Sequence, residues 1–369
     1  MKKIILFLVL CVQLSFAQEL ALVRKDGKFG YINKTGQFAI KPQYEKSKSF
    51  SDGLAPVNEN GKWGFINTTG QMVIPATFDR VGDFSSGLCV AEKAKAYFYI
   101  NKKGETVTTP ASDKLYSFEN GVAFIKRGDK VGLINPKGEV ITEPKYSVIK
   151  PFVGNYARIA SNSQWGIIDN KGKVIIEPAY DDIGDYIQNV AWAKKGETFG
   201  LVIGGAFKAI DGADKIWDFA AQGITYARKD KKIGFIDLKG NWVIEPKFEK
   251  VRAFAKGLAP VFQDKKWGYI DTKGNFVVPP TYPDAEVFSE DGLAPVKDGD
   301  QWGFIDTTGK LVIPANYGIS AGLSLLSEDP KGFIKGVARV KYNKQWGFID
   351  TKGQPLGGQW FDNAELFKL

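Results

Sequence analysis

WGFIDTTGKLVIPANY, residues 302–317, is the stretch that decides the fold class. Close copies of it are WGYIDTKGNFVVPPTY at 267–282 and WGFINTTGQMVIPATF at 63–78. In each copy, β-branched and aromatic residues fill short runs bounded by Gly, Pro, Asn or Asp, which is typical of β-strands joined by tight turns. No stretch of useful length shows the 3.6-residue period of a helix. The sequence therefore predicts an all-β protein built by repetition.

The chain carries ten copies of this unit, centred on the residue after the first aromatic position: 30, 64, 98, 132, 166, 200, 234, 268, 303 and 347. Seven consecutive gaps are 34 residues, and the last two are 35 and 44. We expect three short strands per copy, in a meander: a first strand such as GLAPV at 257–261, the WG strand, and the apolar run after the turn. Residues 18–369 are thus predicted to form one repeat domain.

The turn after the WG strand has a regular chemistry. Asn or Asp opens it in nine copies, and Gly follows three residues later, which suits a type I turn closed by the Asx side chain. Four of the nine are Asn, so a turn role explains the set better than calcium binding or catalysis. Proline is expected to end the third strand. An aromatic two residues beyond the regular proline slot is expected to plug the gap between copies: Tyr44, Phe78, Tyr146, Tyr180, Phe248, Tyr282.

The tryptophan position is predicted to be structural. Across the copies it also holds valine and isoleucine, which could not stack on a ligand as an indole does. The glycine beside it is expected to let another backbone approach closely. We assign these structural roles to Trp63, Gly64, Trp165, Gly166, Trp267, Gly268, Trp302, Gly303, Trp346 and Gly347. The third copy departs from the rule, with Phe98 in the glycine slot and Ser112 in the slot of the plug aromatic.

The string KWGYIDTKG at 266–274, followed by Pro280 and Tyr282, resembles the WG-containing repeat of bacterial exported proteins. The resemblance covers the chain after residue 17 and implies a tandem β-array in or beyond the cell envelope. It brings no catalytic motif that could be carried over. The sixth copy differs most, with Gly204 and Gly205 in place of the usual turn and Gly212 where proline is expected.

Ten such units can bury their faces in an open array or in a closed ring. Propellers usually have four to eight blades of four strands, with periods of about 40 residues or more. We therefore expect an open, twisted β-solenoid or superhelical array. The alternative is a closed β-propeller-like ring, because the chain runs through whole periods.

The first 17 residues have the features of a secretory signal peptide: two lysines, an apolar run and small residues before a cleavage site after Ala17. The run is too short to span a bilayer, and no later stretch is apolar enough to do so. We expect an exported protein of the periplasm, the cell surface or the medium, without a membrane span. The formal net charge is +9, with lysines spread along the chain. This pattern favours a solvated surface over attraction to acidic envelope polymers, and nucleic acid is not expected as a partner.

Histidine is absent, which excludes imidazole bases and nearly all zinc sites. We expect no metal and no cofactor. Loss of the signal peptide would remove Cys11 and leave Cys89, which shares its slot with alanines and is predicted to be a packed small residue.

Function is expected where the copies differ. One slot of the first strand varies widely, and it places Phe124, Arg158, Trp192 and Tyr226 in four successive copies. We predict that these residues form a binding strip for a protein or a glycan; the alternative is that they are half-buried contacts between copies. Trp217 and Trp242 share slots with aliphatic residues and are predicted to lie in the core. A ten-residue insertion falls within 318–336, with no role assigned.

The sequence thus predicts an exported, non-enzymatic binding or scaffold protein of the cell envelope. The alternative is a glycan-active enzyme that uses a carboxylate pair, a chemistry that needs no histidine. A pair of buried carboxylates outside the repeat register would favour the enzyme.

Overall fold

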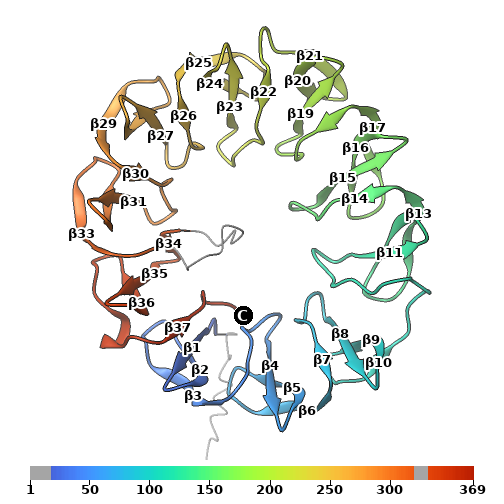
Figure 1. Ribbon diagram of the computed structural model, residues 1–369. Helices are drawn as coiled ribbons and strands as arrows, with labels where there is room; N and C mark the ends of the chain where they lie inside the picture. The colour runs from blue at the N-terminus through green and yellow to red at the C-terminus, as the bar shows by residue number, and fades with distance from the viewer. Residues whose placement is uncertain (1–17, 320–330) are drawn as a thin grey trace, which may run out of the picture.

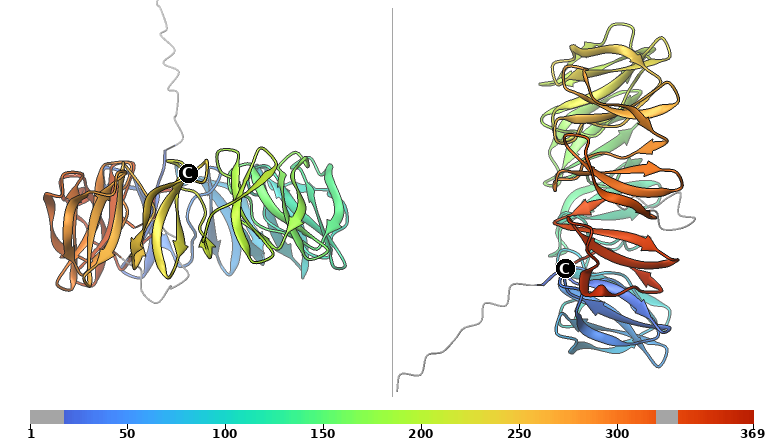
Figure 2. Two further views of the ribbon diagram at one scale, coloured as in Figure 1. Left: turned by 90° about the horizontal axis from the view of Figure 1, so that it is seen from above. Right: turned by 90° about the vertical axis from the view of Figure 1, so that its left-hand side faces the viewer.

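The chain forms a closed ring of ten small β-sheets, one for each repeat (Figure 1). The computed structural model describes residues 18–319 and 331–369, so the expected signal peptide and most of the insertion before the last repeat lie outside the described residues. The expectation of an open solenoid is wrong, because the last strand pairs with the first sheet and closes a ten-bladed β-propeller. Seen from the side, the ring is a flat disc (Figure 2).

The strands of each sheet run in sequence order from the middle of the ring to its rim, except that the first sheet takes its innermost strand, β37, from the C-terminus (Figure 1). The innermost strands are short: β7 (Arg80–Val81), β14 (Val148–Ile149), β18 (Asp182–Ile183), β22 (Lys215–Ile216), β26 (Lys250–Val251), β30 (Asp284–Ala285), β34 (Phe333–Ile334) and β37 (Asn363–Ala364). The second strands are β1 (Ala21–Lys25), β4 (Leu54–Glu59), β8 (Leu88–Lys93), β11 (Ala123–Arg127), β15 (Tyr156–Ser161), β19 (Val190–Lys195), β23 (Ile224–Lys229), β27 (Leu258–Gln263), β31 (Leu293–Asp298) and β35 (Val337–Tyr342).

The sheets of the second and fourth repeats have no short innermost strand among the described residues, so β4 and β11 form their inner edges. In every sheet the WG sequence forms the next strand outward from these second strands. These strands are β2 (Lys28–Ile32), β5 (Lys62–Asn67), β9 (Ala96–Asn101), β12 (Lys130–Ile134), β16 (Gln164–Asp169), β20 (Thr198–Ile203), β24 (Lys232–Asp237), β28 (Lys266–Asp271), β32 (Gln301–Asp306) and β36 (Gln345–Asp350). The outer strands are β3 (Phe38–Tyr44), β6 (Met72–Phe78), β10 (Thr106–Val107), β13 (Val140–Tyr146), β17 (Val174–Tyr180), β21 (Ala206–Ala209), β25 (Trp242–Phe248), β29 (Phe276–Tyr282) and β33 (Leu311–Tyr317). In the tenth repeat a short 3-10 helix, η1 (Leu356–Gly358), follows β36.

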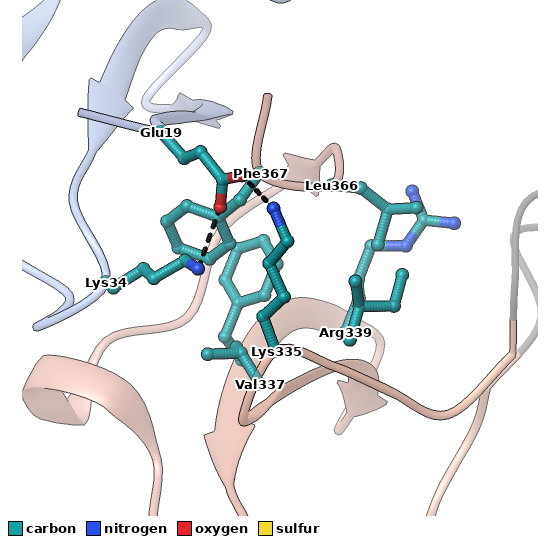
Figure 3. A pocket seen from close by; sticks show the side chains of 9 residues that line it. Glu19, Lys34, Lys335, Val337, Arg339, Leu366 and Phe367 are labelled. Atoms are coloured by element: carbon teal, nitrogen blue, oxygen red, sulfur yellow. Dashed lines mark hydrogen bonds and ion pairs between the residues drawn. The ribbon is translucent and has the colours of Figure 1, made fainter. Parts of the chain in front are cut away.

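The ring is closed by the C-terminal residues, which complete the first sheet. Strand β37 pairs with β1, and Leu20 and Lys368 exchange two backbone hydrogen bonds of 2.8 and 3.0 Å. Beside this ladder the carboxylate of Glu19 binds the ammonium groups of Lys34 and Lys335, from the first and last repeats (Figure 3). The cavity under these side chains has a volume of about 50 Å³, which is room for little more than water. We call this junction the seam.

The hydrophobic core lies between the sheets. Ten clusters of buried residues each join two neighbouring repeats, and the cluster that joins the tenth repeat to the first includes Val23, Phe348 and Phe361. The WG strand is therefore covered on both faces, as predicted from its apolar residues. Cys89 is buried in one of these clusters, and burial raises the pKa of its thiol to about 12, which makes the thiolate scarce.

The glycine after the tryptophan is required by the backbone. A Cβ atom on Gly303 would lie 2.5 Å from the carbonyl oxygen of Ile313 in the outer strand. The register explains the contact: Trp302 pairs with Tyr317 and Phe304 with Ile313, so the outer strand has two extra residues that bulge over the glycine. Pro314 lies in this bulge, within the strand. We expected proline to end this outer strand, which is the third strand of each predicted copy, and that expectation is wrong.

The WG tryptophans lie between sheets, as expected, but most are only half-buried. Trp267 and Trp346 are 8% and 7% exposed, whereas Trp63, Trp165 and Trp302 keep one part of the ring at the surface. A cation often covers that part, as Lys48 does over Trp63 and Lys150 over Trp165. The indoles are structural, with a basic side chain as part of their packing.

A second recurring aromatic was missed in the sequence. It follows the innermost strand and packs on the WG strand of the preceding repeat, as Phe288 does on Tyr269 with ring centroids 5.1 Å apart. Its spacing is 33 to 35 residues, except for 45 across the insertion, and this repeat could have been found: Phe50, Phe84, Phe118, Phe152, Tyr186, Phe219, Phe254, Phe288, Phe333, Phe367. The innermost strands were also missed, because two residues are too few to show an alternating pattern.

Candidate binding surface at the inner rim

The four residues of the predicted strip lie on the second strands of four successive sheets, β11, β15, β19 and β23. Each is half-buried and faces the next repeat. The innermost strand of that repeat ends nearby, and the segment that follows β22 projects toward the middle of the ring (Figure 1). These side chains thus belong to the inner part of the ring wall, which we call the inner rim.

Arg158 connects the fifth repeat to the sixth. Its Nε lies 3.3 Å from Oδ1 of Asp185, and its Nη1 donates to the carbonyl oxygen of Ile183 at 3.5 Å. The pKa of Asp185 is raised, first by burial and then by the charge of Asp218, while Arg158 acts in the opposite direction. The pair is therefore an ion pair on a partly dehydrated wall.

Trp192 repeats the arrangement one sheet further. Its Nε1 donates to Oδ1 of Asp218 at 2.8 Å, and the same oxygen accepts the backbone N–H of Asp185 at 2.7 Å. Gly184 makes room for the ring, since a Cβ there would lie 2.0 Å from Trp192 Nε1. One carboxylate oxygen thus links the sixth and seventh repeats.

Tyr226 packs on Trp217, with ring centroids 4.8 Å apart, and Lys215 lies over the outer part of the same indole. Burial raises the pKa of the Tyr226 hydroxyl, and the nearby negative charge of Asp218 raises it further. The hydroxyl therefore stays protonated and can donate a hydrogen bond.

Phe124 lies apart from these three. Its ring meets Tyr116 edge-on at 5.6 Å, and both line a pocket of about 210 Å³ between the fourth and fifth repeats. Pro151 and Phe152 form the opposite wall. The pocket is mainly apolar and suits one apolar side chain or a small ring.

The structure thus joins Arg158 and Trp192 through Asp185 and Asp218. Tyr226 is close enough to Asp218 for that charge to raise its pKa, and Phe124 lies in a pocket of its own. All four make contacts with their own or the next repeat, so the inter-repeat role that we kept as the alternative is present. Whether the surface also binds a ligand stays a prediction. Asp185 and Asp218 were missed, although both directly precede the recurring loop aromatic, at Tyr186 and Phe219.

The prediction that Trp217 takes the aliphatic core position of its repeat is wrong. The structure puts Ile216 opposite Ala227, where the other repeats have their aliphatic residue, so Trp217 takes the slot of Gly184 at the inner rim. The cause is one residue fewer between the loop aromatics of the sixth and seventh repeats, Tyr186 and Phe219. Trp242, by contrast, packs against a core cluster, as predicted.

The arrangement offers rings, hydrogen-bond donors and carboxylates on one wall. The part of the chain that the structure describes contains no group of three or more His, Cys, Asp or Glu residues placed to hold a metal ion. Among those residues there is also no helix long and apolar enough to cross a membrane. Asp185 and Asp218 occupy the same slot in successive repeats, so they are not the pair outside the register that a glycan-active enzyme would need.

Comparison with known proteins agrees with the repeat pattern. The model of the WG containing repeat matches residues 29–63, 63–95, 97–130, 132–163, 165–199, 233–267, 267–302 and 302–318. The stretch between 199 and 233, which holds the aberrant turn of the sixth repeat, is not matched. No curated protein matches the sequence.

A solved structure shares the fold at low sequence identity, and two others are similar at lower TM-scores. A crystal structure of the eukaryotic initiation factor is 12% identical, with a TM-score of 0.51, and the match covers 95% of this chain and 98% of that one. Dihydro-heme d1 dehydrogenase NirN is also 12% identical, with a TM-score of 0.34 over 80% of this chain and 72% of that one. Hsv2p of Kluyveromyces lactis is 7% identical, with a TM-score of 0.30 over 69% and 97%. At 12% identity, the first of these matches shows the fold alone.

Proposed function

Because the chain belongs to the WG-containing repeat family, we propose that it is an exported, non-enzymatic binding or scaffold protein of the cell envelope, acting through its inner rim. A closed ring of similar sheets offers one extended wall rather than a single deep cleft. The observation that carries the proposal is the link made by Asp185 and Asp218, which connects Arg158 to Trp192 across three successive repeats, with Tyr226 beside Asp218.

The chemistry of this surface suits a protein or a glycan of the envelope. Half-buried rings give apolar faces for packing, and Asp218 and the Tyr226 hydroxyl give an acceptor and a donor beside them. Export rests on the N-terminal 17 residues, which have the composition of a signal peptide.

The test is a variant in which Phe124, Arg158, Trp192 and Tyr226 are replaced by alanine. The matched control replaces Pro56, Pro260 and Pro295, which hold the same strand slot elsewhere in the ring. Retention on purified cell-wall glycan and capture of envelope proteins are measured separately, so the two partner classes are distinguished. We expect the inner-rim variant to lose at least tenfold in one of the two and the proline variant to keep it.

Both variants must first show wild-type circular dichroism, because Arg158 and Trp192 also connect neighbouring repeats. Single variants Trp192→Phe and Tyr226→Phe keep the packing and remove one polar group each. If the folded quadruple variant binds both materials as the wild type does, the inner rim is not the binding surface. Export is tested on its own, by locating the full-length chain and a chain without residues 2–17 in fractionated cells.

A further inference from the structure

The third repeat lacks the plug aromatic that pairs with the WG aromatic in most other repeats. There, the plug aromatic of the outer strand pairs with the WG aromatic, as Phe78 does with Trp63 and Tyr180 with Trp165. In the tenth repeat the pair is explicit, because Trp346 and Phe361 exchange backbone hydrogen bonds of 2.8 and 2.7 Å. Both backbone groups of the WG aromatic are thus directed at the plug.

Phe98 explains the loss. It occupies the glycine slot, where a Cβ would collide with the bulge of the outer strand in the regular repeats. In the third repeat the outer strand β10 has two residues, and its ladder with β9 ends at Tyr99–Val107. The Phe98 ring packs instead against the core between the second and third repeats, 6.3 Å from Phe78. The bulge and the plug aromatic are therefore both missing.

The consequence is an unfilled site at Tyr97. Its ring is 54% exposed, whereas Trp267 and Trp346 in the same slot are 8% and 7% exposed. In front of it lies a cavity of about 520 Å³ lined by Val90, Tyr97 and residues 112–115. Within the described chain no strand lies opposite Tyr97 on the β10 side of the sheet, so its N–H and C=O form an open strand edge.

The polar side chains that line the cavity, Ser112 and Asp113, already have hydrogen-bond partners within the chain. Ser112 donates to the carbonyl oxygen of Lys114 at 2.7 Å and accepts the N–H of Lys126 at 2.9 Å. Asp113 accepts the N–H of Gly128 at 2.7 Å. These groups hold the segment in place and leave the apolar faces of Tyr97, Val90 and Leu115 for an incoming ring.

We propose that this cavity is a second binding site, which takes an aromatic side chain from an extended segment of a partner protein. The segment pairs its backbone with Tyr97 and places a tyrosine or phenylalanine where the other repeats have their own plug. The chain itself shows what such an occupant looks like. In the first repeat Tyr44 pairs with Phe29, and in the fourth Tyr146 pairs with Val131, so that a tyrosine of the outer strand occupies the position that is empty beside Tyr97. This is strand addition at an open edge, with a pocket for one side chain.

The test uses a labelled synthetic peptide with the sequence of residues 140–146, VITEPKY, the outer strand of the fourth repeat. A second peptide carries alanine in place of the tyrosine. Fluorescence polarisation with the full chain is expected to show binding that weakens about tenfold without the ring. Tyr97→Ala should weaken binding of the tyrosine peptide by a similar factor, and Tyr342→Ala, a change at another exposed tyrosine, should leave it unchanged.

Ser112→Tyr, which offers a ring from within the chain, is expected to compete with the peptide, and its folding is checked by thermal unfolding. Absence of binding by the tyrosine peptide would overturn the proposal. So would equal binding of the two peptides, or full binding to a folded Tyr97→Ala protein. The quadruple inner-rim variant should still bind the peptide, which separates this site from the proposed function.

Discussion

The seam and the interface between the eighth and ninth repeats both bury apolar side chains between two sheets, but the segments that they join differ in sequence separation. Between the eighth and ninth repeats, Trp267, Tyr269 and Phe288 come from segments adjacent in sequence. At the seam, Val23 meets Phe361 and Ala364, more than 300 residues away along the chain. The seam adds polar contacts: Glu19 to two lysines, and Ser49 to Glu365. A regular interface is assembled locally, whereas the seam must overcome the entropy of closing the whole chain.

Substitutions in the core should have the largest effect on stability, and they test most directly whether the seam and a regular interface behave differently. Phe361→Ala at the seam and Phe288→Ala at the regular interface remove rings that are 1% and 3% exposed. Each is expected to lower the free energy of unfolding by about 3–5 kcal/mol. Hydrogen exchange should show that Phe361→Ala exposes the amides of Leu20 and Glu365, which donate across the seam, while Phe288→Ala leaves them protected. Equal protection in both variants would mean that the seam is not a separate unit.

Glycine substitutions sharpen the comparison. A Cβ at Gly303 would meet backbone atoms of residues 313–315 at 2.5–2.9 Å, whereas at Gly347 the nearest atom is 2.6 Å away in the Trp360 ring. A side chain can move and a paired backbone cannot, so Gly303→Ala should cost about 3 kcal/mol and Gly347→Ala about 1 kcal/mol. Chemical denaturation of the two variants measures the difference. The reverse order would show that Trp360 is held as rigidly as the strand.

The polar contacts of the seam should matter less. Ser49 is buried and donates to the carboxylate of Glu365, which ties the C-terminal segment of the first sheet to the second repeat, so Ser49→Ala is expected to cost about 1–2 kcal/mol. Ser117 occupies the same slot between the third and fourth repeats, and Ser117→Ala is the matched control, expected within about 0.5 kcal/mol of the wild type. Equal unfolding midpoints for the two variants would contradict a stabilising role for the Ser49 contact.

The smallest effect is expected at Glu19. Hydrogen bonds from Lys335 and Lys34 hold the pKa of its carboxyl below the usual 4.5. Since the pKa is lower in the folded state, the stabilisation is present above pH 4.5 and is lost as the pH falls through the folded pKa. Glu19→Gln should cost less than about 1 kcal/mol at pH 7 and nothing at low pH. A pH series of thermal unfolding tests this; a constant difference from pH 7 to pH 3 would exclude a charge effect.

Much of the inner rim could not be predicted from the sequence. The varied slot identified Arg158, Trp192 and Tyr226, because a change of residue type within a constant repeat is visible in one sequence. Asp185 and Asp218 were not identified, because each acts through a side chain of the preceding repeat that meets it across the interface. The cavity at Tyr97 had a visible signal, the joint change at Phe98 and Ser112, but its consequence depended on the register of the outer strand.

The sequence by itself determined the repeat, the three main strands of each copy, the turn after the WG strand and the burial of most apolar side chains in these strands. Each of these follows from local chemistry: Asn33 closes its turn by accepting the N–H groups of Thr35 and Gln37, and the WG glycine admits a neighbouring backbone. Only the tertiary structure decided that the ten units close into a ring. The rotation from one sheet to the next arises from the packing of ten separate cores, and no single repeat contains the information that β37 will meet β1.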